Sequence, residues 1–250
     1  MAGHSKWAKL KHKKPKTDQA RGKLFSKLIR EITVAARTGG GNPDFNPRLR
    51  SAIEAAKEAN MPSENIEKAI KRGTGELPGV TYEEVEYEGY GPGGVAIIVK
   101  VLTDNKNRTT QEIRHIFSRY GGNLGPTGCV SWQFKPKGVF YVPKDKVDED
   151  TVISLALEAG AEDIKTEEDA YQIITPPDSF FAVKKRLEEE KIPLEHAELT
   201  RLPLTLTPVD EKTGERVLKL QSALEELDEV QQVYANFDIA EEVMERLLEK

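Results

Sequence analysis

The chain has 250 residues, of which 38% are hydrophobic and 32% charged, and its formal net charge is −5. This length can bury one large core or two or three small ones, and the modest net charge argues against wholesale disorder. No apolar run approaches the ~18 residues of a membrane-spanning helix. The basic N-terminus lacks the apolar segment of a secretory signal. The single cysteine, Cys129, excludes an intrachain disulfide framework and a multi-cysteine zinc site. We therefore expect a soluble cytoplasmic protein.

The charge is distributed unevenly along the chain. Residues 1–80 hold 17 Lys and Arg against 8 Asp and Glu, whereas residues 81–250 hold 20 against 34. Such an asymmetry points to an electrostatic target at the basic end.

The first 80 residues predict a basic arm followed by a helical domain. Residues 1–16 show no sustained apolar period and contain Pro15, so we expect a flexible arm. From Thr17, apolar residues recur at helical spacing up to the glycines at 39–41. Asn46 followed by Pro47 predicts the start of a second helix. A third helix is expected to start at Pro62 and to stop at Gly73.

Beyond residue 80 the pattern changes to alternating strands and helices. Strands are expected at 85–88, 94–102, 129–134, 138–142, 162–166, 170–175, 194–201, 204–208 and 230–237. Helices are expected at 109–120, 149–159, 178–190, 213–227 and from Ile239 to the end.

The order from Gly138 onward is β-α-β-β-α-β, which is the ferredoxin-like pattern. The elements on either side of this unit, 94–134 and 204–237, join to make a second set of the same order. The prediction is an α+β fold with an N-terminal three-helix domain (1–80) and two ferredoxin-like αβ domains. The third domain (135–203) is inserted into the second (81–134 plus 204–250). One continuous larger sheet is the alternative.

The arm and the first helix carry the strongest functional signal. Only one acid, Asp18, occurs in the first 30 residues. Separated cations suit phosphates along a nucleic-acid backbone, since neutralising them releases counterions. Trp7 either stacks on a base or packs on its own domain. The candidate nucleic-acid-binding residues here are Lys6, Trp7, Lys9, Lys11, His12, Lys13, Lys14, Lys16, Arg21, Lys23, Lys27 and Arg30.

A second group of cations lies on or near the helix expected at 109–120. Its members are Lys106, Arg108, Arg114, His115 and Arg119. This face is either an ordinary solvated helix face or a second nucleic-acid contact. Arg108 and Arg114 are added to the candidate residues.

The sequence gives little support for a catalytic or metal-binding site. Gly89–Gly94 leads into a strand, whereas a phosphate loop leads into a helix N-terminus. The four histidines form no metal-ligand motif, and Cys129 fits a half-buried structural position. A metal-dependent nuclease could use the acids near 83–88 and Asp104, but no motif fixes them. We expect no catalytic residue, no metal, no cofactor and no small-molecule substrate.

The acidic part of the chain suggests either solubility or a basic protein partner. Residues 135–203 hold 10 basic and 16 acidic residues, and residues 204–250 hold 5 and 12. An acidic surface repels nucleic acid and would orient the molecule with its arm toward the target. A ribosomal or polymerase protein is the kind of partner expected.

Several stretches resemble the YebC/PmpR family, also called the TACO-type family. The matching segments are 1–7 (MAGHSKW), 12–14, 21–32 (RGKLFSKLIREI), 49–53, 60–62, 88–94 (EGYGPGG), 103–105, 107–109 and 130–134 (VSWQF). The resemblance extends over nearly the whole chain. It implies three domains, no enzyme activity and DNA binding in the cytoplasm as a probable transcriptional regulator. Other members of this family act in translation on mRNA or the ribosome and relieve stalling.

Two principal hypotheses follow. The first is a DNA-binding transcriptional regulator, although the helices expected after residues 47 and 62 supply few side chains that read base edges. The second is a ribosome-associated translation factor that binds rRNA or mRNA, for which a cationic arm with one aromatic is well suited. A pure protein-interaction module and the nuclease remain as further alternatives.

Overall fold

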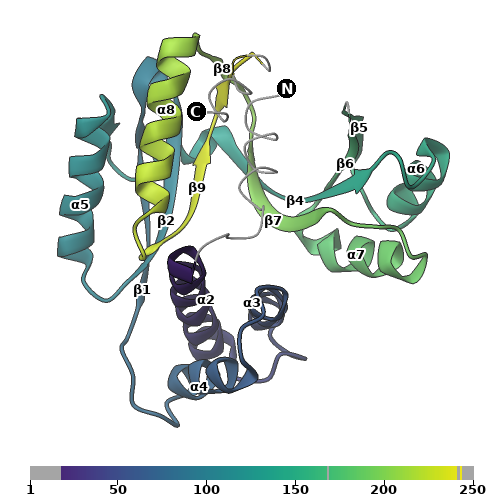
Figure 1. Cartoon of the computed structure of the whole chain (residues 1–250), viewed down its shortest axis with the longest axis horizontal. Helices are drawn as coiled ribbons and strands as arrows, with labels where there is room; N and C mark the ends of the chain where they lie inside the picture. The colour runs from purple at the N-terminus through teal and green to yellow at the C-terminus, as the bar shows by residue number, and fades with distance from the viewer. Residues whose placement is uncertain (1–17, 168, 241–242, 244–250) are drawn as a thin grey trace. The chain divides into compact units, whose positions relative to one another are not determined.

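The computed structural model describes residues 18–167, 169–240 and 243 (Figure 1). The predicted arm lies outside these residues, as does almost all of the helix expected from Ile239 onward. The described chain divides into two compact units. Unit 1 comprises the residues up to Ser131 and from Thr207 onward, and unit 2 comprises Trp132–Leu206. Within the described ranges, no helix is both long and apolar enough to cross a membrane.

Unit 1 begins with three helices, α2 (Asp18–Gly39), α3 (Pro47–Glu58) and α4 (Ser63–Thr74). Their apolar faces share a core that includes Ile32, Leu49 and Ile66. The predicted start of α3 is confirmed, because the Asn46 side chain accepts a hydrogen bond from the Leu49 N–H at 3.1 Å.

The predicted stop of the third helix at Gly73 is wrong. Gly73 is buried inside α4, and a Cβ there would lie 2.4 Å from the Thr33 carbonyl oxygen of α2. The helix ends one residue later, at Thr74, where Gly75 adopts a left-handed conformation with φ +84°. Gly73 therefore permits close helix packing, and Gly75 terminates the helix.

The rest of unit 1, within the described residues, contains a four-stranded antiparallel sheet and two helices. The strands are β1 (Glu83–Tyr90), β2 (Ala96–Thr103), β3 (Asn123–Leu124) and β9 (Val230–Ala235), in the order β3-β1-β2-β9. Helices α5 (Lys106–Arg119) and α8 (Glu211–Glu225) contact each other and the sheet (Figure 1). Strand β2 lies in the middle of the sheet and is almost entirely buried, as its apolar run predicts. Two short strands, β8 (Thr207–Pro208) and β10 (Phe237–Asp238), pair in parallel as a separate sheet.

Unit 2 has the element order expected from the sequence. Its elements are β4 (Phe134–Pro143), α6 (Glu149–Glu158), β5 (Asp163–Thr166), β6 (Ala170–Thr175), α7 (Phe180–Glu189) and β7 (His196–Pro203). The antiparallel strand order β5-β6-β4-β7 is that of a ferredoxin-like fold. Phe140 and Val142 of β4 pack against the helices, whereas Val139 and Tyr141 belong to a cluster on the other face.

The α+β class, with N-terminal helices and antiparallel sheets, is confirmed, but two expected strands differ. No strand spans 129–134: Ser131–Gln133 forms a short 3₁₀ helix, and β4 begins at Phe134. The strand expected at 204–208 is reduced to Thr207–Pro208, because β7 extends to Pro203. The four-stranded sheet of unit 1 therefore contains β1 and the two-residue β3 where the sequence predicted strands at 129–134 and 204–208.

Candidate nucleic-acid interface

Three of the predicted cations on α2 contact the end of α8. Lys23, Lys27 and Arg30 share one helical face because they are spaced by four and three residues. Lys27 Nζ donates to the carbonyl oxygen of Glu225 at 2.6 Å, and Lys23 Nζ donates to that of Glu226 at 3.4 Å.

Arg30 extends this contact beyond the helix. It donates to the carbonyl oxygen of Asp228, and its guanidinium lies 5.7 Å from the centre of the Tyr82 ring. The last carbonyls of a helix lack intrahelical partners and carry the negative end of its dipole. Lys23 and Lys27 therefore stabilise the α8 terminus, and with Arg30 they attach the helices to the αβ part of unit 1.

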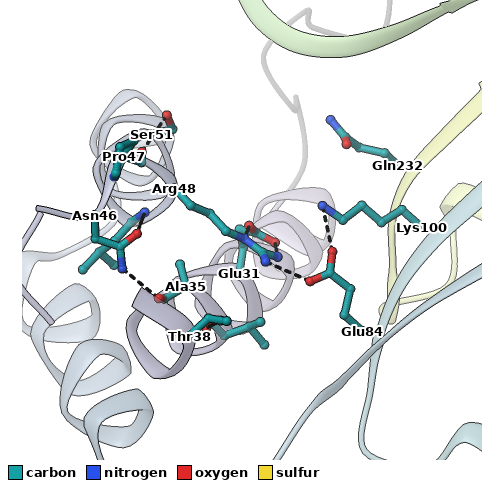
Figure 2. Close-up of polar contacts among 12 residues, drawn as sticks. Glu31, Ala35, Thr38, Asn46, Pro47, Arg48, Ser51, Glu84, Lys100 and Gln232 are labelled. Atoms are coloured by element: carbon teal, nitrogen blue, oxygen red, sulfur yellow. Dashed lines mark hydrogen bonds and ion pairs between the residues drawn. The ribbon is translucent and has the colours of Figure 1, made fainter. Parts of the chain in front are cut away.

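A second group of charges also joins these two parts of unit 1. Figure 2 shows Arg48 of α3 between Glu31 of α2 and Glu84 of β1. Arg48 Nε lies 2.6 Å from Glu31 Oε1, and its Nη1 lies 2.8 Å from Glu84 Oε2. Lys100 Nζ of β2 lies 3.1 Å from Glu84 Oε1. Burial raises the pKa of Glu84, but Arg48 and Lys100 outweigh this effect and hold that pKa below its usual value.

This four-residue network was not anticipated from the sequence. Its members come from four different elements, and Arg48 is 17 residues from Glu31 and 36 from Glu84. No local spacing rule connects such positions, so only the tertiary structure reveals them.

The candidate residues of α5 differ from one another in their surroundings. Arg108 Nη2 lies 2.7 Å from Glu229 Oε1 and 3.0 Å from Asp104 Oδ1, so its charge is matched within unit 1. Arg114 and His115 are exposed on the outer face of the helix. Arg119 is exposed as well, with its guanidinium 5.8 Å from the centre of the Tyr120 ring.

Glu88, one of the carboxylates weighed for nuclease chemistry, has a structural role. Its carboxylate accepts hydrogen bonds from the N–H groups of Gly128, Val130 and Ser131, each at 2.8 Å. The neighbouring Cys129 has a raised pKa because of burial and the negative charge of Glu88. This disfavours the thiolate that a nucleophile requires.

No group of three or more His, Cys, Asp or Glu side chains is placed to hold a metal ion in the part of the chain that the structure describes. The candidate residues of the arm lie outside that part: Lys6, Trp7, Lys9, Lys11, His12, Lys13, Lys14 and Lys16. Of the remaining candidates, the structure places Lys23, Lys27 and Arg30 together, and puts Arg21 nearer the start of α2. Arg108 and Arg114 lie on α5.

The architecture defines a class of α+β protein in which N-terminal helices precede two antiparallel αβ folds. Comparison with known proteins identifies the family. Residues 5–76 match the TACO1/YebC N-terminal domain, and residues 82–237 match the TACO1/YebC second and third domain. The chain belongs to the TACO1/YebC family.

Similar proteins match over nearly the full length. A "Probable transcriptional regulatory protein" of Persephonella marina is 62% identical over 249 residues, covering 99% of this chain and 100% of that protein. A protein of the same name from Aquifex aeolicus is 56% identical over 248 residues, with 99% and 100% coverage. The crystal structure of a conserved hypothetical protein from Aquifex aeolicus superimposes with a TM-score of 0.84 at 56% identity. That match covers 94% of this chain and 97% of the other.

Proposed function

We propose that this protein is a non-enzymatic, cytoplasmic, nucleic-acid-binding regulator of gene expression. The observation that carries the proposal is the separation of charge, with 17 basic and 8 acidic residues in 1–80 against 20 and 34 in the remainder. The names of the similar proteins support a regulatory role, and their wording favours transcription and therefore DNA.

The proposed mechanism is electrostatic docking through the arm. The cations of residues 6–16 neutralise phosphates and release counterions, which drives binding without base recognition. Among the described candidates, Arg21 and Arg114 are exposed and suited to the same task. Lys23, Lys27 and Arg30 already bind the end of α8, so we assign them a smaller share of the phosphate contacts than the arm.

A ribosome-associated translation factor is the second candidate. It is favoured by the exposed surfaces of α3 and α4, which carry Glu58, Glu64 and Glu67 among their cations. A helix that enters the major groove presents cations and amides to the bases and phosphates. Neither helix is well suited to sequence-specific reading, whereas RNA recognition relies more on shape and unpaired nucleotides. The acidic surface of residues 135–203 would then face a basic protein.

The arm mechanism is tested by salt titration. With ~6 phosphates neutralised, affinity for duplex DNA should fall by about 10³ between 50 and 200 mM salt. Replacing Lys9, Lys11, Lys13 and Lys14 with Ala should reduce this dependence. Replacing four exposed lysines elsewhere, Lys57, Lys135, Lys146 and Lys185, should leave it unchanged. A flat salt dependence of the intact protein would contradict the mechanism.

A competition experiment separates the two candidates. Labelled duplex DNA is bound to the intact protein at near-physiological salt, and purified ribosomes or unrelated DNA are added. Displacement by ribosomes at far lower concentration than by unrelated DNA identifies a translation factor. A particular DNA sequence that resists both competitors identifies a transcriptional regulator.

A further inference from the structure

The loop between α2 and α3 presents an isolated aromatic side chain to solvent. Phe45 is 84% exposed, the highest value among the large hydrophobic side chains of the described residues. Its neighbours Asn42, Asp44 and Pro47 are also exposed. Within the described residues 21–76, no other large hydrophobic side chain is exposed.

The backbone on both sides of Phe45 is held in place. Asn46 Nδ2 donates to the carbonyl oxygens of Ala35 and Gly40, both at 2.8 Å. Arg50 donates to the carbonyl oxygens of Pro43 and Asp44, at 3.1 and 2.8 Å. The Phe45 N–H itself donates to the Asn42 carbonyl oxygen at 3.2 Å. The loop therefore presents the ring in one place, and little conformational entropy remains to be lost on binding.

Cations collect at the same end of the three helices. The C-terminal parts of α2 and α4 pack together, because Thr33 Oγ1 donates to the Ala69 carbonyl oxygen at 3.3 Å and Gly73 packs on Ala36. Their last turns carry Arg37, Lys71 and Arg72. Gly41 brings the Phe45 loop against α4, since a Cβ there would lie 2.8 Å from Thr74 Cγ2.

Two further cations here are already engaged, since Arg50 of α3 holds the loop carbonyls and Arg37 donates to the Tyr82 carbonyl oxygen. The acids of these segments are Asp44 and Glu76. Cations thus outnumber acids in the segments that meet at this end. An aromatic face beside cations matches the chemistry of a nucleotide, which has a flat base and a negative phosphate. A protein partner that buries an aromatic anchor instead requires an apolar interface core around it, whereas the exposed loop residues Asn42 and Asp44 beside Phe45 are polar.

We propose that Phe45 stacks on an unpaired base of a bound nucleic acid, while the exposed Lys71 and Arg72 of α4 contact the flanking phosphates. This inference rests on the proposed function and extends it, because it assigns a base-contacting residue to the three helices, whose other candidate residues are cations expected to contact phosphates. Bases inside a duplex are already stacked on their neighbours, so the site selects single-stranded or looped segments.

The test compares two probes with full-length protein: a single-stranded RNA without self-complementarity and a duplex DNA. Loss of one base–aromatic stack predicts that Phe45→Ala weakens single-strand binding by about 5- to 150-fold. Duplex binding should change by less than about twofold, since the phosphate contacts remain. Phe45→Trp retains a flat face and should bind as the wild type does, whereas Phe45→Leu keeps an apolar group without that face and should behave like the Ala variant.

Leu157→Ala is the matched control, because Leu157 on α6 of unit 2 is another exposed apolar residue, at 51%. The unfolding midpoint of Phe45→Ala should equal that of the wild type, which excludes misfolding as the cause of lost binding. Unchanged single-strand binding, or an equal loss on both probes, overturns the stacking role while arm-dependent binding survives. If the wild type binds neither probe, the proposed function itself fails.

Discussion

The carboxylate of Glu88 is only 3% exposed, and three backbone N–H groups take the place of the water it loses on folding. These donors lie in the loop 128–131, which ends where unit 2 begins. The hydroxyl of Tyr90 also donates to the Cys129 carbonyl oxygen in this loop, at 3.1 Å. Glu88 thus fixes a loop that leads into the short 3₁₀ helix Ser131–Gln133.

Replacing Glu88 with Gln should destabilise the protein. The amide NH₂ of Gln would face a backbone N–H, leaving buried donors without an acceptor, which costs about 1–3 kcal/mol. Urea denaturation measures the change. Glu83→Gln, on the exposed start of the same strand, is the control and should have little effect. Equal stability of the two variants would contradict the anchoring role.

Glu88 also predicts a pH dependence of stability. Burial raises the pKa of this carboxyl, but the three N–H donors outweigh burial and hold the pKa below its usual 4.5. The carboxylate therefore contributes its full stabilisation above pH 4.5, and this contribution is lost as the pH falls through the lower folded-state pKa. Denaturation curves collected on both sides of that pH should show a steeper loss for the wild type than for Glu88→Gln. Parallel curves would exclude Glu88 as the source.

At the scale of elements, two of the cations predicted to bind nucleic acid form the contact between α2 and the end of α8. Lys27 and Arg30 are half-buried and bind carbonyl oxygens. A side chain engaged in this way can bind a phosphate only by giving up that contact. We therefore expect these cations to contribute more to the stability of the fold than to nucleic-acid binding.

The double variant Lys27→Ala, Arg30→Ala should lower the free energy of unfolding by about 1–3 kcal/mol, because charged donors at a helix C-terminus are lost. Its salt dependence of DNA binding should stay close to that of the wild type. If the slope of log affinity against log salt concentration becomes shallower by ~0.9 for each cation removed, these cations contact phosphates instead. Lys57→Ala, on the exposed surface of α3, controls for general loss of charge.

Two glycines in neighbouring helices predict opposite effects of the same substitution. Gly73→Ala places a methyl group 2.4 Å from the Thr33 carbonyl oxygen, so α2 and α4 must separate, at a cost of about 1–3 kcal/mol. Gly22→Ala meets no atom within 4 Å on α2 and should stabilise that helix by about 0.5–1 kcal/mol. Thermal unfolding measures the two changes in stability: the midpoint should fall for Gly73→Ala and rise for Gly22→Ala. A stabilising Gly73→Ala would contradict the close packing.

At the scale of the whole molecule, unit 2 has its own core and adjacent chain ends. Phe134 pairs with Pro203 in the sheet, and the Leu204 N–H donates to the Gln133 carbonyl oxygen at 2.7 Å. The chain therefore enters and leaves unit 2 side by side, which is the geometry of an inserted domain. This arrangement supports the proposed division into 135–203 and its flanking segments.

A fragment of residues 132–206 should consequently fold alone. We expect one cooperative transition in urea, with dispersed amide resonances in the absence of denaturant. A broad, non-cooperative transition would indicate that the fragment depends on the rest of the chain for its stability. The full-length protein measured under the same conditions provides the reference.

Much of the fold could be predicted because its signals are local. The Asn46-Pro47 start of α3 and the β-α-β-β-α-β order of unit 2 follow from neighbouring residues and periodicity. The expected strand at 129–134 failed because a distant carboxylate, Glu88, binds the backbone N–H groups of that segment. Gly73 misled the prediction because a glycine that ends a helix and one that permits helix packing look alike in sequence.

The sequence by itself determined the charge separation, the family and the α+β class, since these depend on composition, motif and periodicity. Only the tertiary structure decided which cations are already engaged. It places Lys23, Lys27 and Arg30 on the terminus of α8, about 200 residues away in sequence, and it leaves Phe45 exposed on a fixed loop. The physical reason is that helix termini and buried carboxylates recruit partners by distance in space, and no pattern along the chain records that distance.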